Sequence, residues 1–245
     1  GLGDVYKRQM YSLLEQSSEK LNIDIIHNDP STFKKIYSIV LKHPFLNELK
    51  IHEFKNSGID FPNVTGTHIS EATYYRLFIE DYLSSKNKYY VYMDADIICH
   101  KDPTQSVNAS LFDLESTKYT ISVKTEHRKT KNSEEMFKRL SLAGSTYFNA
   151  GVMLINYKKW KKDNLTGKLT TKMNILGDTI VFWDQDVLNS YFDGEYLELN
   201  NNLNYNLHLT EENSKKKIVK QALNEMILIH YSGSFKPWTV RGAYN

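Results

Sequence analysis

The chain is poor in cysteine, in long hydrophobic runs and in net charge. Cys99 is the single cysteine among 245 residues, so no framework of internal disulfide bonds can form, which fits a reducing compartment. No apolar run reaches the length of a transmembrane helix. The formal net charge of +2 gives no indication of a nucleic-acid partner. We therefore expect a cytoplasmic protein that has no nucleic-acid partner.

The composition is that of a globular domain. Hydrophobic residues make up 40% of the chain and charged residues 24%, and the length suffices for one α/β domain with a sizeable core. The first nine residues show the period of neither a helix nor a strand, and they resemble a non-native peptide. We therefore expect a suspect segment at 1–9, followed by a single domain over residues 10–245.

Strand-like runs alternate with helical patterns along the first half of the chain. Residues 70–83 repeat apolar side chains at spacings of three and four, which predicts a helix. The run Tyr89–Met93 is almost continuously apolar, as is typical of a central strand covered on both faces. Further strands are predicted at 23–26, 50–54, 119–123, 147–156 and 225–230, and further helices at 10–20, 31–43, 134–142 and 184–192. The alternation predicts an α/β domain with a mostly parallel central sheet flanked by helices, and with ligands beyond the carboxyl ends of the strands.

Two carboxylates follow the strand Tyr89–Met93 directly. Asp94 and Asp96 are separated by one residue, and residues i and i+2 of an extended chain point to the same side. Such a pair can share one divalent cation and leave room in its coordination shell for the oxygens of a diphosphate. The alternative is a solvated loop after a strand, where aspartate is common.

Another set of polar groups follows the last predicted strand. His230 is succeeded by Gly233, which permits close approach of the backbone to a ligand, and by Lys236, a compact charge suited to phosphate. A lone histidine in this position is otherwise most often structural. Together with the two carboxylates, the imidazole favours Mn²⁺, with Mg²⁺ as the alternative, over a metal bound by thiolates.

Side chains with sugar-binding chemistry occur at two further places. Asn149 and Gly151 lie at the start of a buried run, where an amide can bond to sugar hydroxyls and a glycine leaves room for them. The alternative is a strand entry with a bulge. Asp184, Gln185 and Asp186 open a predicted helix, where they either recognise a hexose or only cap the helix.

The order of these motifs resembles glycosyltransferase family 8, in particular its bacterial lipopolysaccharide α-galactosyl- and α-glucosyltransferases. The resemblance extends over residues 10–240. It rests on five segments, which are His68–Leu77, Tyr92–Asp96, Tyr147–Asn156, Asp184–Asn189 and His230–Trp238.

The resemblance implies a GT-A fold with a Rossmann-like sheet, and a UDP-sugar as donor. It also implies transfer of galactose or glucose, with retention of anomeric configuration, to a glycan or glycolipid. The implied metal ligands are Asp94, Asp96 and His230. The implied donor contacts are Arg76, Asn149, Gly151, Asp184 and Gln185 at the sugar, and Gly233 and Lys236 at the diphosphate.

The chain departs from the family pattern at both ends. Members normally begin with a strand whose tip carries an Ala-x-Asp segment and a tyrosine or asparagine for uracil and ribose, and residues 1–9 contain no such segment. Members also usually continue well beyond the position of Trp238. We therefore expect a domain that lacks its first strand and is truncated at both ends, with weakened nucleotide binding and an exposed position in the sheet.

For catalysis, Gln185 is the group expected near the reacting face of the sugar, with Asp184 and Asp186 as alternatives. Because an amide is a poor nucleophile, we favour front-face attack assisted by the departing phosphate over a double displacement. Two other functions remain open. One is a phosphatase of the haloacid dehalogenase type, which also places Asp-x-Asp at a strand end, and the other is a non-catalytic nucleotide-sugar-binding fragment.

No motif identifies the acceptor. The basic segment that contains Lys124, Lys129 and Lys131 is suited to an anionic glycolipid or a membrane surface. Its alternative interpretation is an ordinary solvated run of charge. Peripheral contact with the inner face of a membrane is therefore one expectation.

Overall fold

The protein is an α/β domain in which helices surround small sheets. The structure is a computed structural model that describes residues 2–33, 38–63, 70–209, 224–233 and 236–238. The strands are β1 Leu21–His27, β2 Leu46–Glu53, β3 Tyr89–Met93, β4 Ile97–Cys99, β5 Ile121–Arg128, β6 Thr146–Asn156, β7 Leu197–Glu198, β8 Tyr205–Leu209 and β9 Leu228–Gly233. The α-helices are α1 Leu2–Gln16, α2 Ser38–Leu41, α3 Thr104–Glu115, α4 Glu134–Arg139, α5 Tyr157–Lys162, α6 Leu165–Leu176 and α7 Trp183–Phe192. The 3-10 helices are η1 Pro30–Phe33, η2 Glu71–Asp81, η3 Gly177–Thr179 and η4 Asn201–Leu203.

The strands pair in both directions. The central sheet has the order β3-β6-β5-β7, and β1-β2 and β4-β9-β8 form two smaller sheets. Parallel pairing joins β1 to β2, β5 to β7 and β8 to β9, whereas β3–β6, β5–β6 and β4–β9 are antiparallel. The α/β architecture with flanking helices is as predicted, but the pairing is mixed rather than mostly parallel. Strand β6 lies between β3 and β5 and runs opposite to both, which accounts for two of the antiparallel pairs.

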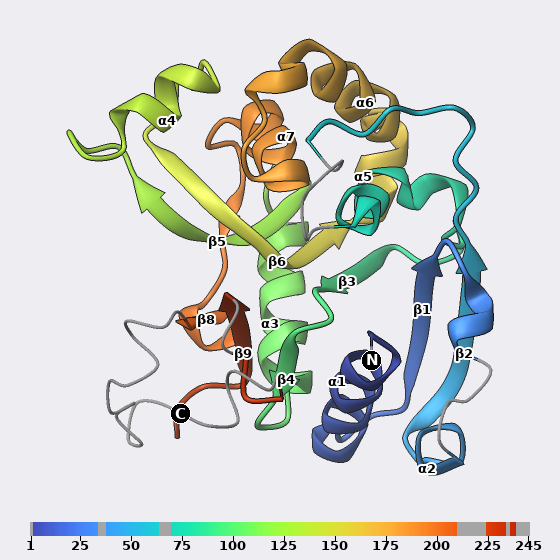
Figure 1. Cartoon of the computed structure of the whole chain (residues 1–245). Coiled ribbons are helices and arrows are strands. Elements are labelled where there is room, and N and C mark those ends of the chain that lie inside the picture. The colour runs from blue at the N-terminus through green and yellow to red at the C-terminus, as the bar shows by residue number, and fades with distance from the viewer. Residues whose placement is uncertain (1, 34–37, 64–69, 210–223, 234–235, 239–245) are drawn as a thin grey trace.

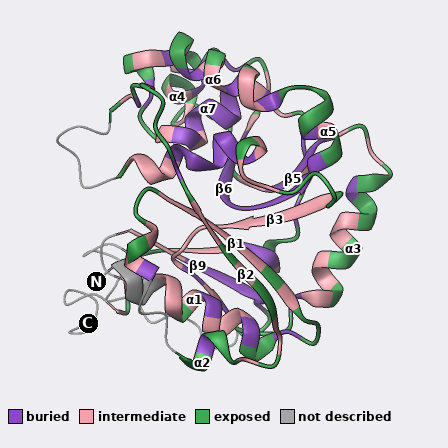
Figure 2. Cartoon of the chain, turned by 90° about the vertical axis from the view of Figure 1, so that its right-hand side faces the viewer, coloured by how far each residue is buried: buried purple, intermediate pink, exposed green. Residues whose placement is uncertain are grey.

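The central strand of the core is β6. Every residue from Tyr147 to Asn156 is buried, and Figure 2 shows this strand and α7 as the buried centre of the upper half. From Val152 to Ile155 its side chains alternate between two apolar clusters, so that Val152 contributes to one and Met153 to the other. Helices α7 and α3 both contact β6, from above and below in the view of Figure 1. This burial fixes the position of the residues at the start of β6.

Strand β3 differs from its prediction. It was expected to be the central, doubly covered strand, but within the described residues it pairs only with β6 and is half-buried along its length. The sequence of β3 is almost as apolar as that of β6. The number of partners a strand has is set by the order of strands in the sheet, which local composition does not encode.

Other elements follow their predictions in part. The expected helix at 70–83 is the 3-10 helix η2, with a non-helical Phe78, and the expected helix at 31–43 appears as η1 and α2 on either side of residues 34–37, which lie outside the described part. The sequence of the suspect segment 1–9 shows no helical period, yet α1 begins at Leu2. None of the helices in the described residues is long and apolar enough to cross a membrane.

Candidate active site

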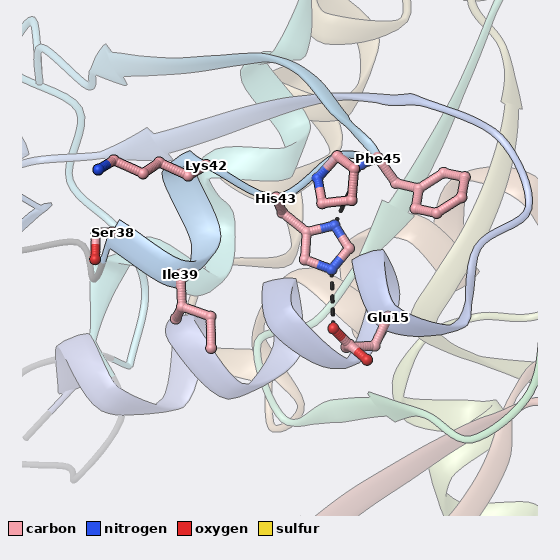
Figure 3. Close-up of a pocket in the computed structure, with 7 residues that line it drawn as sticks. Glu15, Ser38, Ile39, Lys42, His43 and Phe45 are labelled. Carbon is pink, nitrogen blue, oxygen red and sulfur yellow. Dashed lines mark hydrogen bonds and ion pairs between the residues drawn. The ribbon is translucent and has the colours of Figure 1, made fainter.

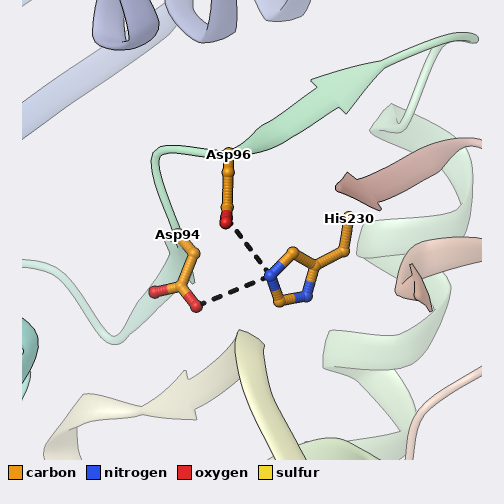
Figure 4. Close-up of side chains that lie close together, drawn as sticks. All are labelled: Asp94, Asp96 and His230. Carbon is orange, nitrogen blue, oxygen red and sulfur yellow. Dashed lines mark ion pairs between the residues drawn. The ribbon is translucent and has the colours of Figure 1, made fainter. Parts of the chain in front are cut away.

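The link between β3 and β4 and the middle of β9 bring together three side chains whose ligand atoms could hold a metal ion (Figure 4). Asp94 and Asp96 lie in the link, and antiparallel pairing of β4 with β9 sets Ile97 opposite His230. One ligand atom from each of the three side chains lies within 4.8 Å of the other two. His230 Nε2 is 3.2 Å from Asp96 Oδ1 and 3.9 Å from Asp94 Oδ2. The three residues that the sequence predicts as metal ligands therefore lie at one place.

Basic groups stabilise the ionised form of Asp96. Lys236 Nζ lies 2.5 Å from Asp96 Oδ2. Burial opposes ionisation of Asp96, but the hydrogen bond and charge of His230, together with Lys236, outweigh burial and lower the pKa of Asp96 to about 2. Burial also opposes protonation of His230, and the nearby Asp96 and Asp94 outweigh it and raise the pKa of His230 above its ordinary value. Gly233, the last residue of β9, has a φ of 87°, a conformation that favours glycine.

A buried arginine connects the cluster of Asp94, Asp96 and His230 to the start of α7. Arg76, in η2, is 6% exposed and lies 2.6 Å from Asp94 Oδ1 and 2.8 Å from Asp184 Oδ2. It also donates a hydrogen bond of 2.5 Å to the carbonyl oxygen of Ala150 in β6. Tyr92 donates to the same Asp94 oxygen at 2.7 Å, and the guanidinium lies over its ring. This arrangement fixes the orientation of Asp94 relative to α7.

Strand β6 passes so close to the cluster that only glycine fits. The carbonyl oxygen of Gly151 accepts a hydrogen bond of 2.8 Å from the backbone of Asp94. A Cβ atom at Gly151 would lie 2.4 Å from His230 Cε1 and 2.5 Å from His230 Nδ1. The space that Gly151 leaves is therefore filled by the imidazole ring, and not open for a sugar as the sequence interpretation had it.

Amide side chains gather around Glu126 near the start of β6. Gln185 Oε1 accepts a hydrogen bond of 2.9 Å from the backbone of Ala150, and its Nε2 lies 3.3 Å from Glu126 Oε2. Asn149 Oδ1 accepts from the backbone amide two residues later at 2.9 Å, and its Nδ2 lies 3.4 Å from both Glu126 oxygens. Asn206 of β8 donates to Glu126 Oε1 at 2.8 Å. The predicted sugar-binding residues Asn149 and Gln185 thus share one carboxylate.

The two aspartates at the start of α7 have different surroundings. Asp184 is 3% exposed, accepts a hydrogen bond of 2.5 Å from Thr73, and has a pKa that burial raises to about 6 although Arg76 acts to lower it. Asp186 is fully buried and accepts from Tyr147, from an arginine of α4 and from two backbone amides of the preceding loop. Both oxygens of Asp186 are therefore occupied. The catalytic role that the sequence left open for Asp186 finds no support here, because this carboxylate holds the loop before α7.

Sequence reasoning missed Glu126 and Asn206. Glu126 lies in a segment interpreted as a basic loop, which in the structure is the end of β5, and Asn206 lies on β8, a strand that was not predicted. The β-branched run of Ile121, Val123 and Thr125 was an available signal for a longer strand, but not for the direction of the Glu126 side chain.

A separate depression of about 510 Å³ lies between α1 and the segment from α2 to β2 (Figure 3). Its lining consists of Glu15, Ser38, Ile39, Lys42, His43, Pro44 and Phe45. Glu15 Oε1 and His43 Nε2 lie within hydrogen-bond distance of each other, at 3.0 Å. It contains none of the predicted site residues.

Comparison with known proteins assigns these features to a family. The family model described as Glycosyl transferase family 8 matches residues 8–241. The lipopolysaccharide 1,3-galactosyltransferase of Salmonella typhimurium is 30% identical over 175 residues, which cover 71% of this chain and 51% of the relative. The lipopolysaccharide 1,2-glucosyltransferase of Escherichia coli is 32% identical over 175 residues, which cover 68% and 49%. The chain thus spans about half the length of these two curated relatives.

A solved structure supports the same assignment at the level of the fold. The galactosyltransferase LgtC, in complex with donor and acceptor sugar analogs, superposes with a TM-score of 0.72 at 20% identity, covering 97% of this chain and 86% of that chain. The predicted GT-A fold is thereby confirmed. The family match also includes all five sequence motifs, from His68 to Trp238. The chain therefore belongs to glycosyl transferase family 8.

Proposed function

We propose that this chain is the donor-binding catalytic domain of a divalent-metal-dependent hexosyltransferase. It transfers galactose or glucose from a UDP-sugar to a glycan or glycolipid, with retention of anomeric configuration. The observation that carries this proposal is the cluster of Asp94, Asp96 and His230 beside Lys236. The lipopolysaccharide galactosyl- and glucosyltransferases among the relatives support the class of sugar. Membership of the family removes the grounds for a phosphatase of the haloacid dehalogenase type.

The side chains of the cluster fit a hard or borderline divalent cation. They offer two carboxylates and one imidazole, a donor set that suits Mn²⁺, with Mg²⁺ as the alternative. Asp96 Oδ1 is buried and lies 3.2 Å from His230 Nε2, so these two ligand atoms face each other at the place where one cation would bind. When bound, such a cation supplies the charge that stabilises a leaving diphosphate.

The residues around the cluster bind and orient the donor. Lys236 provides positive charge on the same side as Asp96, where it can contact phosphate oxygens. Arg76 holds Asp94 and Asp184 in fixed positions, so its contribution to donor binding acts through these carboxylates. Gly233 gives the backbone close to His230 the freedom to approach the diphosphate.

The sugar lies, in this proposal, against Asn149, Asp184 and Gln185. Gln185 is the group at the reacting face, and its amide is fixed by the backbone of Ala150. Because an amide is a poor nucleophile, the acceptor attacks from the front face, and its proton passes to the departing phosphate. The reacting sugar then resembles an oxocarbenium ion, as in glycosyl transfer generally.

A glycolipid acceptor at the inner face of a membrane is the proposed partner. Both named relatives are lipopolysaccharide glycosyltransferases. Lys129 and Lys131 are exposed between β5 and α4, whereas Lys124 lies 3.8 Å from Glu198 and is partly neutralised. The two exposed lysines are therefore the ones suited to anionic headgroups, in a protein that acts in the cytoplasm.

Calorimetric titration with UDP tests the proposal. The titration is made with Mn²⁺, with EDTA, and with the double variant Asp94→Asn/Asp96→Asn in Mn²⁺. We expect UDP binding to require the metal. The double variant should weaken binding by more than roughly 100-fold, because it removes two metal ligands, and even the loss of a residue that only positions a ligand typically costs 10- to 100-fold. Asp113→Asn, the same exchange at an exposed position of α3, serves as the control and should bind as the wild type does.

Two outcomes would count against this function. Absence of metal-dependent UDP binding in the wild type would contradict the donor site. Binding of UDP-glucose and UDP-galactose without any release of hexose, even to water, would instead favour the non-catalytic binding protein.

A further inference from the structure

An irregularity in β5 turns the carboxylate of Glu126 toward the amide cluster, which consists of Asn149, Gln185 and Asn206. Thr125 pairs with Phe148 and His127 pairs with Tyr147, so the register against β6 shifts between them. Glu126 is the extra residue and has no partner opposite it in β6. Such a bulge redirects the side chain of the extra residue, and bulges are frequent beside active sites.

Three amides from three elements converge on this carboxylate. Asn206 of β8 makes a short contact of 2.8 Å, which anchors Oε1. Asn149 of β6 and Gln185 of α7 lie at 3.4 Å and 3.3 Å, longer than the roughly 2.7–3.2 Å of a well-formed N–H···O bond. Glu126 is exposed, and within the described residues it forms no ion pair. The carboxylate is therefore held at one oxygen and retains capacity to accept stronger hydrogen bonds.

We propose that Glu126 accepts a hydroxyl group of the donor hexose and so helps to determine which hexose is transferred, an inference that rests on the proposed function. A hydroxyl donating to a carboxylate forms a shorter and stronger bond than the long amide contacts, so a sugar can replace those contacts at little cost. Asn149 and Gln185, which share Glu126, are the residues expected at the sugar, whereas Lys236 marks the diphosphate end. Because epimeric hexoses differ in the direction of one hydroxyl, an anchored acceptor distinguishes between them.

The test compares affinities for UDP, UDP-glucose and UDP-galactose in Mn²⁺, measured by calorimetry on the whole chain. The ratio of UDP-hexose affinity to UDP affinity isolates the contribution of the sugar. In Glu126→Gln we expect UDP affinity within about twofold of wild type and the affinity for the preferred UDP-hexose lowered about tenfold, the size of one charge-assisted hydrogen bond. The preference between the two hexoses should shrink with it.

Two further variants sharpen the result. Glu198→Gln makes the same exchange on β7, where the carboxylate accepts from the backbone of Thr125 at 3.0 Å and does not contact the amide cluster, so the ratio should stay unchanged. Asn206→Ala removes the anchor of Glu126 and should lower the ratio by a smaller factor than Glu126→Gln. If the ratio of UDP-hexose affinity to UDP affinity is unchanged in Glu126→Gln, this inference is overturned and the metal-dependent donor site stays intact. A wild type that binds no UDP would overturn both.

Discussion

At the scale of single residues, the absence of a side chain at Gly151 allows β6 to pass close to the cluster of Asp94, Asp96 and His230. A Cβ atom there would lie 2.4 Å from the ring of His230. In Gly151→Ala the ring must therefore shift, which changes its position relative to Asp94 and Asp96. We expect metal-dependent UDP binding weakened at least about tenfold in calorimetry, and the free energy of unfolding in urea lowered by about 1–3 kcal/mol.

Gly167→Ala is the matched control for that exchange. Gly167 lies on α6, and the three heavy atoms nearest to a Cβ atom there all belong to the side chain of Asn164, with 2.8 Å to Nδ2. This flexible side chain can move, and alanine favours a helix over glycine by roughly 0.5–1 kcal/mol, so stability should hold or rise slightly. Unchanged UDP binding in Gly151→Ala would contradict the contact between β6 and His230.

Asp184 makes the stability of the metal-free protein depend on pH. Burial raises the pKa of its carboxyl from 3.8 to about 6, so the folded protein holds this proton more tightly than the unfolded chain. Its favourable contribution is fully present below a pH of about 4 and is lost as the pH rises through about 6. Relative to Asp184→Asn, which does not titrate, the free energy of unfolding of the wild type should fall by roughly 2–3 kcal/mol between pH 4 and pH 7. Urea unfolding in EDTA at each pH checks this, and a constant difference between the two proteins would contradict it.

At the scale of elements, α1 joins the small β1-β2 sheet to the rest of the molecule. Leu14 is fully buried in a cluster with Met10 and Val40, and Ser12 Oγ accepts a hydrogen bond of 3.0 Å from the backbone of Cys99 in β4. We expect Leu14→Ala to lower the free energy of unfolding in urea by about 2–5 kcal/mol, because it leaves a cavity between helix and sheet. Leu41→Ala makes the same exchange at a residue that is 53% exposed, and it should change stability by no more than about 0.5 kcal/mol. Equal effects of the two variants would mean that α1 does not pack on the sheet in this way.

At the scale of the whole molecule, the parts that the sequence predicted are those marked by abrupt changes in local pattern. Asp94 and Asp96 follow an apolar run without interruption, and His230 lies within another, so each was recognisable as a polar group at a buried strand. The two aspartates and His230 lie close together because β4 pairs with β9. That pairing joins residues far apart in the chain, and it came within reach of prediction only through the resemblance to a family.

The parts that the sequence did not predict depend on strand register and strand order. Glu126 reaches the amide cluster because one residue is inserted in the pairing of β5 with β6, and nothing in its neighbours signals that insertion. Likewise β3 and β6 have similar composition, but one lies at an edge of the described sheet and the other in its middle. Both features are properties of the assembled sheet, and a local pattern cannot encode them.

The single cysteine offers a way to measure how the whole molecule opens. Cys99 is 5% exposed in β4, its thiol donates to the carbonyl oxygen of Lys101 at 3.0 Å, and burial raises its pKa to about 12. The thiolate is the reactive form, so a disulfide reagent at pH 8 should modify the folded protein at least roughly 1000-fold more slowly than the unfolded chain. Because β4 pairs with β9 and packs on α1, modification requires both contacts to break.

The rate of Cys99 modification therefore reports on cooperativity. If the sheets of the described structure unfold as one unit, the opening free energy obtained from that rate should equal the free energy of unfolding measured in urea within about 1 kcal/mol. Addition of Mn²⁺ with UDP should then raise both free energies equally. Cys99→Ser provides the blank for the labelling reaction. If Cys99 is modified much faster than the free energy of unfolding in urea allows, β4 separates from β9 locally. Asp96 and His230 would then part without global unfolding, and the proposed metal site would open more readily than the fold as a whole.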